Sequence, residues 1–223
     1  SRAMRDHIDH FGWGASDLAQ GCEQMADMLG CAPLPGGQHP GMGTQNALLS
    51  LGDGVYLEII APSDDPGPEG SFGHRLAAMP APGLITWVLR TDALAKVAKL
   101  SDSGDQDLTA LGPMTTQRET PEGDMLSWEL LFLGGHGFGG LLPFFIDWQD
   151  TIHPSQTSPV AAQYASLVIA SPNADPLNQT FKTLDIEQRA QSADTASLKL
   201  ELQSSGQTVT LTSTDQSLKS WIT

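Results

Sequence analysis

Hydrophobic residues recur at two spacings near the start of the chain, and together they predict one compact unit. Residues 7–15 read as a strand. Four apolar residues then recur every three or four positions, as on one face of a helix: Leu18, Cys22, Met25 and Leu29. Asp17 before this stripe and Gly30 after it are typical helix caps. Strands at 46–51 and 55–61 flank a Gly-Asp-Gly turn, so the unit is β-α-β-β.

A second unit of the same order follows a long connection rich in proline and glycine. A strand is predicted at 84–91, a helix capped by Asp92 comes next, and strands are predicted at 125–133 and 142–148, so the unit is β-α-β-β or β-α-β-β-β. Self-similarity at a long spacing is typical of units that cannot bury their sheet faces alone. We therefore expect the first two units to pack as a pseudo-symmetric pair, with Asp17 and Asp92 at equivalent helix starts.

A third, degenerate unit is predicted near the end of the chain. It has a strand at 164–170, a helix, and two alternating strands at 198–203 and 208–212. The repetition predicts an α+β fold, in which helices cover one face of antiparallel sheets and the other faces curl around a shared cavity. We expect residues 5–150 to hold the paired first and second units, and residues 160–215 to form a third unit packed on them.

The composition narrows the range of partners. Twenty-six acidic residues face 11 basic ones, and the net charge is -15, which makes nucleic acid and anionic membranes poor partners. No apolar run approaches the length of a membrane span. Cys22 and Cys31, nine positions apart, match neither a redox pair nor a zinc knuckle. Two free thiols predict a cytoplasmic protein.

Two polar side chains interrupt apolar rows on predicted strands. Strand alternation places His10 and Glu58 each in an otherwise apolar row. A buried carboxylate without a partner is costly, so Glu58 needs a cation, a hydrogen-bond donor or a proton. We expect the two side chains to lie within reach of each other on the inner face of one sheet. By the same alternation, His7 and Asp9 point the opposite way, to a solvated strand edge.

The segment GGHGFGG at 134–140 contains the GxGxxG spacing of dinucleotide-binding loops. That motif requires a following helix whose amino terminus meets the pyrophosphate, whereas a strand is predicted here. A mobile loop at the mouth of a pocket, with His136 contacting substrate, is the functional interpretation, and a plain linker is the alternative. Trp87 and Trp128 fall on predicted strands and are candidates for an apolar pocket wall, with core packing as the alternative.

Two stretches resemble a known family. The run HIDHFGWGASDL, with the amphipathic helix that follows it, and the run HPGMGTQNALLSLGDGVYLEIIAP resemble the opening module of glyoxalase-like domains in the vicinal oxygen chelate superfamily. WEL near Trp128 and PFFIDW near Phe144 resemble later strands of the same group. The resemblance implies paired βαβββ modules that form a cupped, half-open barrel of mixed and antiparallel strands with helices outside. It also implies one divalent metal ion on the inner face.

The resemblance places metal ligands at His10 and Glu58, with Glu58 as ligand or base. The second unit departs from the family pattern, because Ile85 stands seven places before Asp92 and cannot bind metal, and only Asp147 lies near the usual glutamate. Two protein ligands are too few for tight zinc binding. The spacing does not select a third ligand among His7, His39, His136 and Asp147.

Two classes of function stay open. The first is a glyoxalase-like enzyme that acts on a small carbonyl or phenolic molecule, with lyase, isomerase or dioxygenase chemistry and one divalent ion such as Zn, Mn, Fe, Ni or Mg. The second is a metal-free protein that binds or sequesters a small molecule. In both, we expect Trp87, Trp128, His136 and Asp147 to line the substrate pocket, and a homodimer is compatible with either.

Overall fold

The computed structural model describes residues 7–221, and its elements repeat one order, β-α-β-β-β, three times. The first repeat comprises β1 (Ile8–Gly14), α1 (Leu18–Leu29), β2 (Leu34–His39), β3 (Thr44–Ser50) and β4 (Tyr56–Pro62). The second comprises β5 (Gly83–Arg90), α3 (Leu94–Ser101), β6 (Thr109–Glu119), β7 (Met125–Gly134) and β8 (Phe144–Asp147). The third comprises β9 (Gln163–Ser171), α4 (Ala174–Thr183), β10 (Ala190–Ser192), β11 (Ser197–Ser204) and β12 (Gln207–Thr212). The described residues also form short helices at α2 (Phe72–Ala77), η2 (Gly139–Leu141), η3 (Pro154–Gln156) and α5 (Asp215–Ser220).

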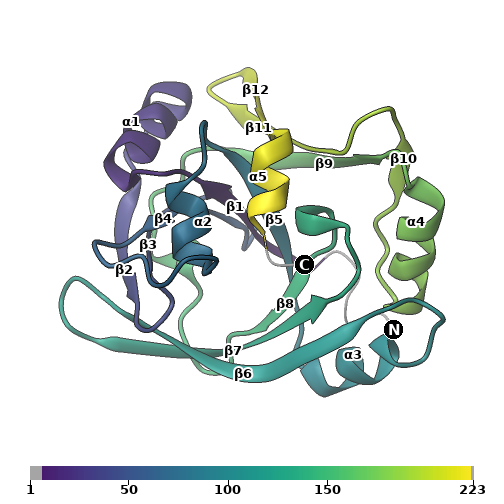
Figure 1. Cartoon of the computed structure of the whole chain (residues 1–223). Coiled ribbons are helices and arrows are strands. Elements are labelled where there is room, and N and C mark those ends of the chain that lie inside the picture. Colours follow the sequence, from purple (N-terminus) through teal and green to yellow (C-terminus); the bar gives the residue numbers. More distant parts are fainter. Residues whose placement is uncertain (1–6, 222–223) are drawn as a thin grey trace.

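The first two repeats close into one barrel, in the order β1-β4-β3-β2-β6-β7-β8-β5. β1 pairs with β4 and β5 with β8 in parallel, while the other neighbours are antiparallel. The barrel is closed rather than half-open, although β2 and β6 share a single register pair, Gln38 with Glu119. Helices α1 and α3 lie outside it (Figure 1). The predicted α+β fold of tandem modules is confirmed.

The third repeat forms a separate sheet, in the order β10-β9-β11-β12, that packs on the outside of the barrel. Backbone hydrogen bonds join the two sheets. The Ser50 carbonyl accepts from the amide of Ala161 at 3.0 Å, and the Leu51 carbonyl accepts from the amide of Tyr164 at 2.9 Å. One apolar core continues across this junction. None of the described helices is long and apolar enough to cross a membrane.

Helix α1 begins and ends as its sequence predicts. The Asp17 side chain accepts a hydrogen bond from the amide of Gln20 at 2.8 Å, and Gly30 takes a left-handed conformation at the other end. The prediction of an equivalent cap at Asp92 is wrong. Helix α3 has Ala93 at its N-cap, and alanine has no side-chain acceptor for a capping bond. The Thr91 hydroxyl accepts a hydrogen bond from the amide of Ala93.

Pattern reading missed strands β2 and β6. Both lie at the barrel seam, and their sequences, LPGGQH and TALGPMTTQRE, show no apolar alternation. Strand β6 is mostly exposed, so no burial requirement shapes its sequence.

Two irregularities in the β1–β5 ladder set the direction of the side chains near the barrel centre. The register shifts once between Ile8 and His10 on β1, and again between Gly12 and Trp13, opposite Ile85 on β5. A bulge inserts a residue into one strand and re-aims the side chains around it. The simple alternation used to assign faces therefore fails at Asp9 and at Ile85.

The glycine-rich loop is packed beneath the C-terminal helix rather than placed at a pocket mouth. Helix α5 lies beside β5 (Figure 1), where the Ser217 hydroxyl donates to the Leu84 carbonyl at 2.6 Å. A β-carbon at Gly140 would lie 1.8 Å from the Ile85 carbonyl oxygen. A glycine is therefore required at residue 140 by the close approach of two backbones.

Replacing Gly140 by alanine should destabilise the fold by about 2 kcal/mol or more, because the backbone of β5 must move to admit a methyl group. Gly137→Ala is the matched control. Gly137 has a positive φ of 75° but open space around it, so its replacement should cost only about 1 kcal/mol of conformational strain. Urea unfolding of both variants checks this, and equal losses would contradict the packing of the loop under α5.

Candidate functional site

The barrel encloses a cavity with one polar and one apolar side. The space between its lining atoms is about 660 Å³, counting the open mouth. The apolar side comes mainly from the second repeat and the C-terminal segment: Ile85, Leu130, Phe132, Phe144 and Trp221. The polar side comes mainly from the first repeat: His10, His39, Asn46 and Glu58. The cavity therefore suits a small molecule with an apolar body and one polar end.

His10 and Glu58 lie together on the cavity wall, as predicted. They project from the neighbouring strands β1 and β4, and His10 Nε2 lies 3.6 Å from Glu58 Oε1. The His10 ring is 3% exposed and stacks on Tyr56, with ring centroids 4.4 Å apart. Strand β4 beside it and the ring of Tyr56 stacked on it hold the His10 imidazole with its Nε2 edge toward the Glu58 carboxylate.

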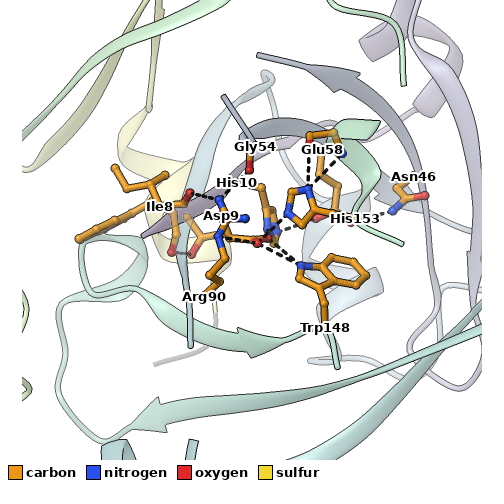
Figure 2. A network of polar contacts seen from close by, with 12 residues as sticks. Ile8, Asp9, His10, Asn46, Gly54, Glu58, Arg90, Trp148 and His153 are labelled. Atoms are coloured by element: carbon orange, nitrogen blue, oxygen red, sulfur yellow. Dashed lines mark hydrogen bonds and ion pairs between the residues drawn. The ribbon is translucent and has the colours of Figure 1, made fainter. Parts of the chain in front are cut away.

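Asp9 is the main correction at this site, because it is fully buried rather than at a solvated strand edge. The bulge after Ile8 lets adjacent side chains meet, so Asp9 Oδ2 lies 2.7 Å from His10 Nδ1. Figure 2 shows two further partners around the same carboxylate: His153 Nε2 lies 2.8 Å from Oδ1, and the Trp148 indole donates to Oδ1 at 3.0 Å. His7, by contrast, is exposed as expected.

The charges of this cluster follow from its geometry. Burial alone would lower the pKa of His10, but the hydrogen bond with Asp9 and the nearby Glu58 carboxylate raise it to about 9. Burial would raise the pKa of Glu58, but His10 and the Asn46 amide lower it to about 2. The same imidazolium and His153 hold the pKa of Asp9 below its usual range against the effect of burial. At neutral pH a cationic His10 therefore lies between two carboxylates.

His39 completes the polar wall without carrying a charge. Its Nε2 lies 3.8 Å from Glu58 Oε2, and its Nδ1 lies 2.9 Å from the Thr44 hydroxyl. Burial lowers the pKa of His39, so the ring is neutral at physiological pH. The Asn46 amide donates to the same Glu58 oxygen at 2.8 Å. Glu58 thus faces His10 with one oxygen, and His39 and Asn46 with the other.

The residues present do not form a metal centre with the usual three protein ligands. Among residues 7–221, no group of three or more His, Cys, Asp or Glu side chains is placed to hold a metal ion. His10 Nε2 and Glu58 Oε1 offer two donors, and the apolar Ile85 faces the cavity from the second repeat. The second repeat therefore adds no metal ligand to the pair.

Three of the four residues expected to line the pocket lie elsewhere. Trp128 lines the cavity, but Trp87 is buried in the outer core, where its indole donates to the Leu141 carbonyl at 2.9 Å. The bulge at Ile85 turns that residue inward, so Trp87 no longer shares its face. His136 and Asp147 do not line the cavity either. The His136 Nε2 atom lies 2.9 Å from the Leu133 carbonyl oxygen, and the Asp147 carboxylate accepts a hydrogen bond from the amide of Gln149.

Sequence reasoning also missed four residues of the site: Asp9, Arg118, His153 and Trp221. The alternation of side chains along β1 predicted that Asp9 points to solvent. Arg118 lies on β6, whose sequence has no alternation of apolar and polar residues. His153 follows β8 in an irregular segment, and Trp221 reaches the cavity from beyond the last predicted element. Their positions depend on contacts between residues distant in sequence.

Comparison with known proteins agrees with this architecture. The model of the family described as "Glyoxalase-like domain" matches residues 8–184. The chain belongs to the glyoxalase-like domain family. Solved structures similar to this glyoxalase-like protein share its fold. No sequence among the curated proteins matches it significantly.

Several solved structures share the fold. A hypothetical protein from Staphylococcus aureus is 16% identical, with a TM-score of 0.64, over 93% of this chain and 84% of that one. Methylmalonyl-CoA epimerase from Mycobacterium tuberculosis is 20% identical, with a TM-score of 0.50, over 67% of this chain and 92% of that one. A triple mutant of 4-hydroxymandelate synthase from Streptomyces coelicolor is 14% identical, with a TM-score of 0.54, over 93% of this chain and 62% of that one. At these identities the likeness shows the fold alone.

The raised pKa of His10 predicts a loss of stability in alkali. Its contribution is complete below the usual value of 6.5 and disappears as pH rises through about 9. The lowered pKa of Glu58 acts oppositely, since its contribution is complete above 4.5 and disappears as pH falls through about 2. The free energy of unfolding should therefore fall between pH 6 and pH 9.5, by an amount on the order of 2 kcal/mol.

Urea unfolding at these two pH values, in chelator-treated protein, measures the change. His10→Gln is the comparison, because it removes the titrating group while other groups continue to titrate. Wild type should lose more stability than the variant between the two pH values. The same loss in both proteins would contradict a cationic His10.

Proposed function

We propose that this glyoxalase-like protein binds, inside its barrel, a small molecule with an apolar, ring-containing body and a carbonyl or phenolic oxygen, and acts on it at His10 and Glu58. The observation that supports the proposal most is the His10–Glu58 pair, a buried charged pair that lines the same cavity as an apolar and aromatic wall. Buried charges cost stability, so they are typical of sites kept for binding or chemistry.

His10 has the capacity to receive the ligand oxygen. Its Nε2 lies 3.6 Å from Glu58 Oε1, which is beyond a good hydrogen bond, so the N–H of the imidazolium keeps a free donor. Asp9 occupies the opposite nitrogen and fixes the direction of the ring. A preorganised cationic donor in a cavity stabilises negative charge that develops on an oxygen.

Glu58 is the group for moving a proton. Without a ligand, the low pKa of Glu58 makes this carboxylate a weak base. A ligand oxygen bound to His10 shares the positive charge, which weakens the effect of His10 on Glu58 and raises the pKa of the carboxyl. The carboxylate then lies beside the ligand, where it accepts a proton from a phenol or from the carbon next to a carbonyl.

Removing the charge of Glu58 should weaken ligand binding without unfolding the protein. Glu58→Gln keeps the shape and the contact with Asn46, so we expect little loss of melting temperature and about tenfold or greater loss of affinity for phenols and aryl ketones. Quenching of tryptophan fluorescence reports binding, because Trp128 and Trp148 line the cavity.

Glu129→Gln is the matched control, since Glu129 accepts a hydrogen bond from Gln149 outside the cavity.

Exchange of the α-hydrogens of a bound ketone with deuterium then separates an enzyme from a binding protein, because only catalysis speeds that exchange. Equal affinity of wild type and Glu58→Gln would contradict the proposed site.

A metal-dependent enzyme is a second candidate, and one contact favours it. Asp9 behind His10 is the arrangement that supports many metal-ligating histidines, where a carboxylate binds the outer nitrogen. His10 and Glu58 would hold the ion, although the third protein ligand is missing among the described residues. A divalent ion supplies Lewis-acid stabilisation of an oxyanion in such enzymes.

Equilibrium dialysis of chelator-treated protein against Zn²⁺ and Mn²⁺ tests this candidate. Binding of about one ion per chain in wild type, lost in Glu58→Gln and kept in Glu129→Gln, is the outcome expected of a metal site with two protein ligands. Absence of stoichiometric binding would leave the metal-free function as the conclusion.

A further inference from the structure

Strand β6 is exposed along most of its length, with one exception. Arg118 is only 6% exposed, and its side chain lines the cavity together with Thr116 from the same face of the strand. A long cationic side chain on an exposed strand ordinarily keeps its charged end in water. Here the guanidinium is instead directed into the barrel.

The buried guanidinium lacks a carboxylate partner. Its Nη1 donates to the Gly36 carbonyl, and no Asp or Glu oxygen within residues 7–221 lies close enough to form an ion pair with it. Burial disfavours the charged form and lowers the pKa of Arg118, but an arginine stays protonated in proteins. Glu58 attracts the guanidinium only from beyond ion-pair distance and is itself bound by Asn46, so Arg118 keeps buried donors that no carboxylate of the described residues occupies.

We propose that Arg118 binds a carboxylate group of the ligand, so that the natural ligand is a small aromatic or otherwise apolar carboxylic acid. This inference rests on the proposed function, which assigns the other oxygen of the ligand to His10 and Glu58. The guanidinium fork matches a carboxylate in shape and hydrogen-bonding pattern. The Thr116 hydroxyl on the same wall offers one further donor.

The donors that remain on Arg118 favour a singly charged group. A single arginine, one of whose nitrogens already binds a carbonyl, neutralises one negative charge rather than the two of a phosphate monoester. The chain as a whole carries a net charge of -15 and repels anions. An anionic ligand therefore requires a local cation such as Arg118 to enter the barrel.

A purely structural role is the rival explanation. Arg118 ties β6 to Gly36 of β2 at the seam, where the two strands share a single register pair. In that role its loss would lower stability and would weaken the binding of neutral and anionic ligands equally. The preference for an acid over its amide separates the two roles, because the amide has nearly the same shape without the charge.

The experiment measures dissociation constants for two matched pairs, phenylacetate with phenylacetamide and 3-phenylpropionate with 3-phenylpropionamide. Wild type should prefer the acids by about tenfold or more. Arg118→Gln should abolish that preference, and Arg118→Lys should retain part of it. Arg75→Gln is the matched control, because Arg75 on α2 does not line the cavity, and it should leave the preference unchanged.

The outcomes distinguish this inference from the function on which it rests. Binding of acids and amides with equal affinity, or an unchanged preference in Arg118→Gln, would overturn the role of Arg118 and leave the proposed pocket intact. Binding of none of the four probes would overturn both. If Arg118→Gln fails to fold, the preference of wild type and its change in Arg118→Lys decide the question.

Discussion

The arrangement of the site depends on one buried carboxylate, that of Asp9. Four donor groups from separate parts of the chain surround it: His10 beside it on β1, Arg90 at the end of β5, Trp148 after β8, and His153 in the segment that follows. A carboxylate without water needs such partners, so it fixes their positions. By holding the imidazole of His10, it also sets the charge and direction of the group that faces the cavity.

The charged pair of His10 and Glu58 lies on one side of the cavity. The first repeat supplies the polar residues His10 and Glu58, whereas the second supplies the apolar residues Ile85 and Phe144 from the adjoining strands β5 and β8. The first repeat therefore supplies the proposed polar pair, and the second supplies most of the apolar wall together with Arg118. A cavity divided in this way orients a ligand that has one polar end.

Much of this architecture was readable from the sequence, and the failures have a common cause. The helical stripe of α1 and the apolar rows around His10 and Glu58 follow regular periods, so they predicted both the module and the proximity of the pair. Asp9 and Trp87 were placed on the wrong face because bulges shift the period by one residue, and no local residue pattern marks them. Arg118 lies on an exposed strand, where burial imposes no pattern.

The cost of the buried charges bears on whether the barrel acts on its ligand or only stores it. An apolar wall of phenylalanine and tryptophan is enough to sequester a hydrophobic molecule. Arg118 and the Asp9–His10–Glu58 group are buried charges that an apolar lining of the same shape would not need. A ligand held at Arg118 and at His10 would be fixed at two points, with Glu58 beside its oxygen-bearing end. Fixed orientation of this kind is what a reaction needs and simple storage does not, and it is the reason we propose an enzyme rather than a storage protein.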